Sequence, residues 1–303
     1  MTQEKQFHYG VITDEIHMDL EEALKVAKSL GMTHVELNNV WDKPIADFTA
    51  EDISRAKGLL DTYGLRVHVI CSMLFRPFAL DDVELDTMEQ HPRFQEHMDQ
   101  LDRSIVIAKA LGAPYIRTFA FSRHAGFGNP SPRFPDGGGI PDDVLAKIAK
   151  GLRIACDRAA ESGITLALEN ARAFYANTGG NQRRILDAVN HPNLKIIWDP
   201  ANAFVAGETP FPDGYEAVKG HIVDVHCKDA RVVDDATGLT EWMPIGSGGT
   251  PWDAQIAALV DTDVDTLTIE THWHPEGSTK AADTQHVFEQ LQGIIAGATG
   301  GKS

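Results

Sequence analysis

Cysteine is scarce in this chain, and apolar residues never run long enough to cross a membrane. Only three cysteines occur among the 303 residues, and none belongs to a CxxC pair, so the sequence predicts reduced thiols and no disulfide framework. No run of about 18 apolar residues is present, and the opening MTQEKQFHYG lacks the apolar core of a signal peptide. We therefore expect a cytoplasmic protein with no membrane partner.

Basic residues are also in short supply. The chain contains 27 Lys and Arg against 44 Asp and Glu, which gives a formal net charge of −17. A surface of this sign repels nucleic acid and anionic membranes, so we expect no nucleic-acid partner. Most of the excess acid is expected on a solvated outer face, and it does not identify a substrate.

Nucleotide-binding glycine motifs are absent as well. No GxGxxG follows the first expected strand (residues 8–13), and the chain contains no P-loop. The Gly246 to Gly249 turn could still bind an anion through its backbone N–H groups. We accordingly favour a sugar without a phosphate group as the substrate.

The chain does contain a regular alternation of short apolar runs and segments with helical spacing. Eight strand-plus-helix units follow one another, which favours parallel βαβ connections. Their number, without a break in composition, predicts an α/β fold with one (β/α)8 TIM barrel over residues 1–303, and not a doubly wound sheet. Residues 122–140, rich in Gly and Pro, are expected to form a lid or a subunit contact of a homo-oligomer, and residues 297–303 a frayed tail.

Three carboxylates and one histidine stand where successive strands are expected to end. The segments TLALEN, IIWDPAN, VDVHCKD and TIETHWH supply, in this order, Glu169, Asp199, His226 and Glu270, separated by 30, 27 and 44 residues. In a barrel these ends share one face, and neighbouring strands are about 4.8 Å apart, so the four side chains can converge on one ion. Such a set suits Mn²⁺, our first choice, or Mg²⁺ or Co²⁺.

Each of these residues also has an ordinary explanation when it is taken alone. A carboxylate at a strand end can form an ion pair or cap a turn, and His226 can be a hydrogen-bonded core histidine. The joint occurrence at four successive strand ends favours the metal site. His272 and His274 lie beyond the last strand end, where a pocket position and a surface position are both open.

Several segments, notably VELNNVW, LGAPYIRTF, LALEN, WDPAN, VHCKDAR, PIGSGGTPW and TIETHW, resemble the sugar phosphate isomerase/epimerase superfamily of xylose-isomerase-like barrels. The resemblance covers nearly the whole chain. It implies that the four strand-end residues are the metal ligands and that Glu169 and Glu270 perform the acid/base chemistry.

The same resemblance implies substrate contacts at Glu36, His68, Lys228 and Arg231. One position departs from the pattern. Asn202 stands where many epimerases and dehydratases of this group have histidine. An asparagine can still hold a sugar hydroxyl, but it cannot titrate, so the departure weakens any transfer of substrate identity.

These observations predict a divalent-metal-dependent isomerase or epimerase that acts on a ketose or sugar derivative through an enediolate. The main alternative is a metal-dependent lyase, or dehydratase, acting on a keto-sugar or keto-inositol, because loss of a β-hydroxyl can follow the same proton removal. An apurinic-site nuclease would need more histidine ligands and a surface that tolerates DNA. A non-catalytic sugar-binding barrel would not need the intact ligand set.

Overall fold

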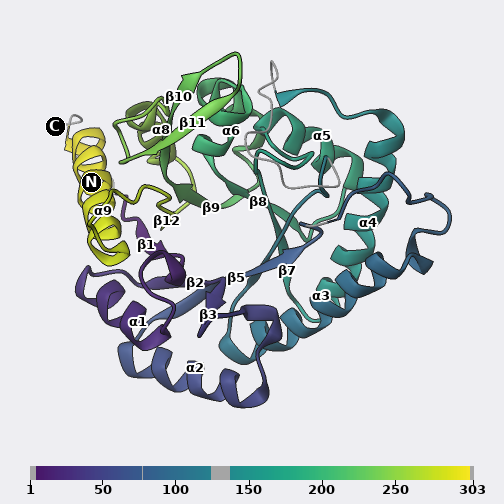
Figure 1. Ribbon diagram of the computed structural model, residues 1–303, viewed down its shortest axis with the longest axis horizontal. Helices are drawn as coiled ribbons and strands as arrows, with labels where there is room; N and C mark the ends of the chain where they lie inside the picture. The colour runs from purple at the N-terminus through teal and green to yellow at the C-terminus, as the bar shows by residue number, and fades with distance from the viewer. Residues whose placement is uncertain (1–4, 77, 124–136, 301–303) are drawn as a thin grey trace.

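The computed structural model describes residues 5–76, 78–123 and 137–300, and within them eight parallel strands form a single sheet (Figure 1). In chain order these strands are β1 (His8–Val11), β2 (His34–Leu37), β5 (Arg66–Leu74), β6 (Tyr115–Thr118), β7 (Thr165–Glu169), β8 (Leu194–Trp198), β9 (Ile222–Cys227) and β12 (Thr266–Ile269). Each pairs in parallel with its sheet neighbours, which confirms the predicted βαβ connections.

The two ends of this sheet meet. Its strand order is β1-β12-β9-β8-β7-β6-β5-β2, and a parallel bridge between Ile12 and Glu36 joins the β1 end to the β2 end. The Thr33 N–H also donates to the Tyr9 carbonyl across this seam, at 3.0 Å. The result is a barrel, and the TIM-barrel prediction is confirmed.

Helices surround the barrel (Figure 1). They are α1 (Leu20–Ser29), α2 (Ala50–Tyr63), α3 (Pro92–Leu111), α4 (Asp142–Ala160), α5 (Gly179–Val189), α6 (Pro200–Ala206), α7 (Tyr215–Val218), α8 (Trp252–Leu259) and α9 (Lys280–Gly300). Helix α1 shows why the sequence specifies them. Its residues Leu20, Leu24 and Ala27 are buried on one face, and the Asp19 carboxylate caps its first turn.

Short elements connect these units. They are the 3₁₀ turns η1 (Thr13–Glu15), η2 (Ile45–Asp47) and η3 (Met88–Gln90), the π turn η5 (Pro210–Gly214), and the antiparallel hairpins β3 (Asn39–Val40) with β4 (Lys43–Pro44) and β10 (Asp229–Asp234) with β11 (Leu239–Met243). The sequence analysis missed the β10–β11 hairpin, which follows β9 directly.

Most of the apolar core lies between the barrel and its helices. Inside the barrel a small separate cluster is formed by Val69, Cys71, Ala167 and Ile197. All three cysteines are buried and unpaired, in agreement with the expectation of reduced thiols. No helix in the described part of the chain has the length and apolarity that a membrane span requires.

Two expected flexible segments fall partly outside the described residues. Of the lid or contact loop at 122–140, residues 124–136 lie outside them. Helix α9 continues to Gly300, so residues 297–300 of the expected tail are helical, and residues 301–303 lie outside the described residues.

Candidate active site

Four strands deliver the predicted metal ligands to one place. Glu169 is the last residue of β7, Asp199 follows β8 and caps α6, His226 lies in β9, and Glu270 follows β12. Each side chain offers a ligand atom, and these four atoms all lie within 4.8 Å of one another. All four residues are buried. The structure therefore brings the four together at the carboxyl ends of the strands, as the barrel geometry requires.

Charged contacts tie this cluster together. His226 Nδ1 lies 3.2 Å from Glu270 Oε2 and 3.8 Å from Glu169 Oε1. The Lys228 ammonium lies between two of the carboxylates, 2.7 Å from Asp199 Oδ2 and 2.6 Å from Glu270 Oε2. Lys228 therefore compensates part of the negative charge of the three buried carboxylates, which would be costly to bury without a cationic partner.

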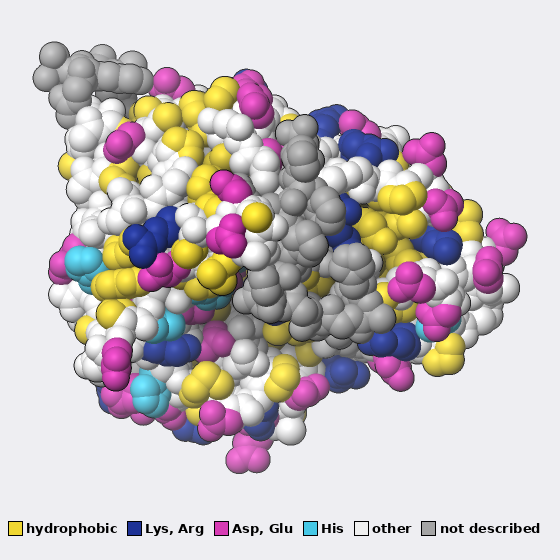
Figure 2. All heavy atoms as spheres, turned by 45° about the horizontal axis from the view of Figure 1, so that its top comes forward, with side chains coloured by type: hydrophobic (Ala, Val, Ile, Leu, Met, Phe, Trp, Pro, Cys, Tyr) yellow, Lys and Arg dark blue, Asp and Glu magenta, His cyan; other side chains and the backbone are white. Residues whose placement is uncertain are grey.

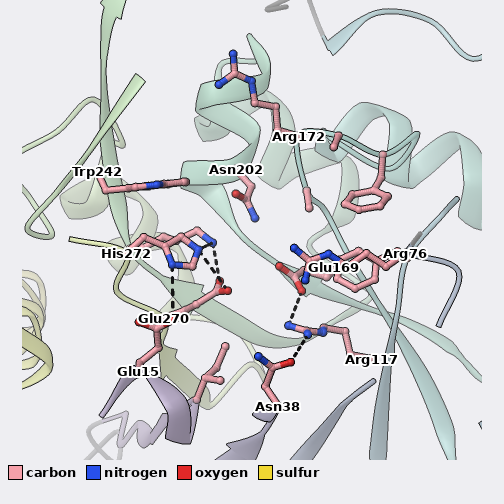
Figure 3. Close-up of a pocket in the computed structure, with 16 residues that line it drawn as sticks. Glu15, Asn38, Arg76, Arg117, Glu169, Arg172, Asn202, Trp242, Glu270 and His272 are labelled. Atoms are coloured by element: carbon pink, nitrogen blue, oxygen red, sulfur yellow. Dashed lines mark hydrogen bonds and ion pairs between the residues drawn. The ribbon is translucent and has the colours of Figure 1, made fainter. Parts of the chain in front are cut away.

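Arg117, in β6, plays the same part for Glu169. Its Nη1 lies 3.1 Å from Glu169 Oε2, and its Nη2 donates to Asn38 Oδ1 at 3.1 Å (Figure 3). Both charged side chains are almost fully buried. The sequence analysis did not assign Arg117 to the site, although a charged residue inside the apolar strand PYIRTFAF was a usable signal.

The surroundings shift the pKa values of these groups. Burial opposes the charge of Glu270, but Lys228 and His226 outweigh it and hold the pKa of this carboxyl well below its usual range. Burial, reinforced by Glu270, raises the pKa of Asp199 to about 6 despite Lys228. Burial also disfavours a charged His226, yet Glu36 and Glu270 raise its pKa well above the ordinary value.

The cluster fits a divalent cation. Asp199 Oδ2 and Glu169 Oε2 are buried without a hydrogen bond of normal geometry, and their cationic neighbours lie at 2.7 Å (Lys228 Nζ) and 3.1 Å (Arg117 Nη1). Each carboxylate oxygen has more than one lone pair, so it can accept a metal ion as a further cationic partner. Three carboxylates and one imidazole are a donor set for hard or borderline divalent ions. The residues present thus match the kind of ion predicted from the sequence.

Glu36 lies behind His226 and not in the cavity, which corrects its assignment as a substrate contact. Its Oε2 is 3.2 Å from His226 Nε2 and accepts from Cys71 Sγ at 3.0 Å, and its side chain is fully buried. Burial opposes its charge, but His226 lowers the pKa of Glu36 to about 2. A carboxylate on Nε2 turns Nδ1 toward the other three ligands, an arrangement typical of metal-bound histidine.

An open cavity of about 270 Å³ lies directly against this cluster. Its polar lining residues are Glu15, Asn38, Arg76, Arg117, Glu169, Arg172, Asn202, Lys228, Glu270 and His272, and its aromatic lining residues are Phe119, Phe174 and Trp242. In Figure 3, Trp242, His272 and Glu270 lie on one side of the cavity, and Glu169, Arg117 and Arg76 lie on the other.

Two of the expected substrate contacts do reach this cavity. Lys228 lines it, and so does Asn202. The Asn202 backbone N–H donates to Asp199 Oδ1 at 2.7 Å, and its side-chain Nδ2 donates to the Asn170 carbonyl at 2.8 Å. His272 also lines the cavity, whereas His274 pairs with Glu15 and Asp283 beside it.

Two other expected contacts are placed elsewhere. His68 is the third residue of the long strand β5, so it lies toward the opposite end of the barrel, where its Nε2 is 3.3 Å from the Val223 carbonyl. Arg231 is exposed on β10 and pairs with Glu241 at 2.6 Å. Neither is among the described residues that line the cavity.

The glycine turn at 246–249 is not an open anion site. The Asp229 carboxylate accepts from the backbone N–H groups of Gly246, Gly248 and Thr250, at 2.9–3.1 Å. These are the donors that an external anion would have used. The chain's own carboxylate takes that place, so the turn does not offer these N–H groups to an external anion.

The β10–β11 hairpin contributes residues that the sequence analysis did not find. Trp242, in β11, forms an edge-to-face pair with His272, at 4.8 Å between ring centroids, and its ring lies 5.3 Å from Lys228 Nζ. Arg172 donates to the Gly238 carbonyl and, at 3.3 Å, to Thr240 Oγ1, which fixes the hairpin over the site.

Comparison with known proteins agrees with this geometry. The family model described as xylose isomerase-like TIM barrel matches residues 24–291. The chain belongs to this family. Fructoselysine 3-epimerase of Shigella flexneri is similar in sequence. It is 24% identical over 253 residues, which cover 80% of this chain and 82% of that enzyme.

Two solved structures have a similar fold. L-ribulose 3-epimerase has a TM-score of 0.70 at 17% identity, covering 97% of this chain and 96% of its own. The IOLI protein with a bound zinc atom has a TM-score of 0.73 at 15% identity, covering 96% of this chain and 99% of its own. At these identities the structures establish a shared fold.

Proposed function

We propose that this protein is a divalent-metal-dependent epimerase that acts on a ketose or ketose derivative through an enediolate. The observation that carries the proposal is the placement of two glutamates, Glu169 and Glu270, on opposite sides of one cavity within a set of four candidate ligands (Figure 3). The match to fructoselysine 3-epimerase, which spans most of both chains, supports epimerisation over other ketose chemistry.

Epimerisation requires a base on one face of the reacting carbon and an acid on the other. Glu270, held ionised by Lys228 and His226, is suited to accept the proton from the α carbon. Glu169 lies on the opposite side with Arg117 Nη1 3.1 Å from its Oε2, and it would deliver a proton to the other face after taking that proton up from solvent, so that one proton enters at Glu169 for each one that leaves from Glu270. The two roles exchange when the substrate is the opposite epimer.

The neighbouring residues hold the sugar and its developing charge. Asn202 and His272 offer side chains to hydroxyl groups, and the Trp242 ring closes one side of the cavity. The Lys228 ammonium is positioned to stabilise negative charge on substrate oxygens. When bound at the four ligands, a divalent ion would polarise the substrate carbonyl and so acidify its α C–H.

The identity of the ion stays a prediction. The donor set of three carboxylates and one imidazole accepts Mn²⁺, Mg²⁺ and Co²⁺, and no contact among the described residues selects between them. Mn²⁺ remains our first choice for assays.

The test is turnover of ketoses in D₂O with Mn²⁺ present. The proposal predicts deuterium at the α carbon and the appearance of the C3 epimer, with no loss of water. Formation of the aldose would indicate an isomerase, and a product lighter by the mass of one water would indicate the dehydratase instead. Glu270→Gln should abolish exchange, whereas Glu276→Gln, an exposed residue just beyond the site, should leave it unchanged.

A further inference from the structure

Arg117, the ion-pair partner of Glu169, is itself held at its other end by an asparagine. Asn38 follows β2 and lines the cavity, and its Oδ1 accepts from Arg117 Nη2 at 3.1 Å (Figure 3). The Cys71 carbonyl also accepts from Nη2, at the longer distance of 3.4 Å. One end of the guanidinium therefore contacts Asn38, while the other end, Nη1, lies 3.1 Å from Glu169 Oε2.

A carboxylate fixes the Asn38 amide in turn. The Asn38 Nδ2 donates to Asp14 Oδ2 at 3.0 Å. Asp14 lies in η1, just after β1, so this hydrogen bond spans the two ends of the sheet. A guanidinium can only donate and a carboxylate can only accept, so a flipped amide would face a donor with its own donor and an acceptor with its own acceptor. The two partners thus determine the orientation of the Asn38 side chain.

The two carboxylate oxygens of Glu169 face different partners. Its Oε1 lies 3.8 Å from His226 Nδ1, on the side of the candidate ligands, and its Oε2 faces Arg117. The guanidinium group is planar and rigid, so the position of Nη1 depends on what holds Nη2. The direction of the Glu169 carboxylate in the cavity therefore depends on Asn38.

We propose that Asn38 is a positioning residue for the proton transfer at Glu169. The contacts that transmit this effect, named here the Asn38 network, join Asp14, Asn38, Arg117 and Glu169. The inference rests on the proposed function, in which Glu169 and Glu270 serve opposite faces of the reacting carbon. A break in the network should slow the step at Glu169 and spare the step at Glu270, because a separate set of side chains holds Glu270 across the cavity.

Primary isotope effects separate the two steps. D-fructose and D-allulose, D-tagatose and D-sorbose, and L-ribulose and L-xylulose are pairs of C3 epimers, and each is supplied with deuterium at C3 to Mn²⁺-saturated protein. In Asn38→Leu we expect epimerisation to fall about 10-fold to 100-fold, the range of a hydrogen bond to a charged group. The isotope effect should fall for the epimer that Glu270 deprotonates, because proton removal there becomes reversible, and it should rise for the other epimer.

Neighbouring side chains supply the matched variants. The Asn39 Nδ2 donates to the same Asp14 oxygen, at 2.9 Å, and among the described contacts it does not reach Arg117. Asn39→Leu should therefore keep the isotope effects of the wild type. Asp14→Leu breaks the Asn38 network one residue farther from the cavity and should act in the direction of Asn38→Leu, which covers the case that the latter does not fold. Asp14→Asn should retain most of the wild-type behaviour, because its amide oxygen can still accept from Asn38.

A double-mutant cycle in urea unfolding tests the Asn38 network without any substrate. If Asn38 acts on Glu169 through Arg117, the effect of Glu169→Gln on the unfolding equilibrium constant should be about 3-fold to 100-fold smaller in Asn38→Leu than in the wild type. In Asn39→Leu the effect of Glu169→Gln should stay within about 2-fold of that in the wild type. Calorimetric titration with Mn²⁺ verifies that each variant still binds the ion.

Three results would overturn the inference. A raised KM with unchanged isotope effects would assign Asn38 to substrate binding, loss of Mn²⁺ binding in Asn38→Leu would assign it to the ligand set, and additive effects in the cycle would exclude the coupling to Glu169. Failure of the proposed function is a distinct outcome. Wild-type protein that epimerises none of the three pairs but shows the coupling would count against the epimerase and leave the Asn38 network standing, whereas epimerisation with additive effects would do the reverse.

Discussion

The variant Glu36→Gln tests whether the Glu36 carboxylate strengthens His226 as a metal ligand. In the structure the two side chains are fully buried, and Glu36 Oε2 lies 3.2 Å from His226 Nε2. A glutamine oxygen can still accept the Nε2–H, so the substitution removes the charge but keeps the shape. We therefore expect Nδ1 to remain pointed at the other ligands while the imidazole becomes a poorer electron donor.

The size of the effect follows from this geometry. Loss of a carboxylate that supports a metal-bound histidine lowers metal affinity by about 10-fold to 100-fold, or about 1.4–2.7 kcal/mol. We expect the upper part of this range, because both groups are buried and no solvent screens the pair. The Cys71 thiol, which donates to Glu36 at 3.0 Å, is too weak a partner to replace the lost charge.

The assay is calorimetric titration of chelator-treated protein with Mn²⁺. Wild-type protein and Glu51→Gln, a substitution of an exposed residue on α2, provide the controls. An affinity of Glu36→Gln within 2-fold of the wild type, in a protein with an unchanged urea midpoint, would refute the role that we assign to Glu36.

Three further predictions concern the stability of the fold. Arg117→Met leaves the buried Glu169 without its ion-pair partner, so urea unfolding should show a loss of about 3–5 kcal/mol, and a loss below 1 kcal/mol would contradict the pairing. Asp229→Ala removes the acceptor of three loop N–H groups and should cost about 3 kcal/mol in the same assay, whereas an unchanged midpoint would mean that the loop is held by other contacts. Burial lowers the pKa of His97 from 6.5 to about 4, so the unfolded chain takes up the proton first as the pH falls. Stability is therefore complete above about pH 6.5 and declines toward pH 4, by up to about 3 kcal/mol. The variant His97→Asn can keep an acceptor for the Phe75 N–H. It should lower by about one the number of protons taken up on unfolding, a number obtained from the unfolding free energies at pH 7 and pH 4.5 in urea. A pH dependence of stability identical to that of the wild type would contradict this prediction.

The sequence was sufficient to predict the barrel because the period of its apolar residues changes regularly between strand and helix. It also placed Glu169, Asp199, His226 and Glu270 together, since the carboxyl ends of successive parallel strands must share one face. The structure confirms the fold and shows this convergence. Their role as ligands remains a prediction that the measurements above address.

The depth of a residue within the barrel was harder to predict. Glu36 and His68 are each the third residue of their strand, but the register between β2 and β5 shifts at this point, so that Glu36 pairs with Val69. Glu36 therefore lies against His226, whereas His68 lies nearer the opposite end, against the Val223 carbonyl. Alternation along a strand fixes the face of a side chain and not its height relative to strands distant in sequence. That height depends on the register of the sheet.

The sequence analysis also failed to find the site residues that lie outside the barrel strands. Trp242 belongs to a hairpin whose segment, LTEWM, is mixed in polarity and carries no clear alternation. Arg76 follows β5 in a stretch without periodicity. The Gly246 to Gly249 turn was considered as a site that could bind an anion, because the sequence does not show that Asp229 folds back onto its N–H groups.

The most direct test of the central claim is titration of chelator-treated protein with Co²⁺, followed by visible absorption. The account predicts saturation at one ion per chain, a raised unfolding temperature, and loss of both effects in a variant that combines Asp199→Asn with His226→Gln. Wild-type protein that shows neither saturable absorption nor thermal stabilisation with Co²⁺ or Mn²⁺ would contradict the metal site and the epimerase mechanism that depends on it.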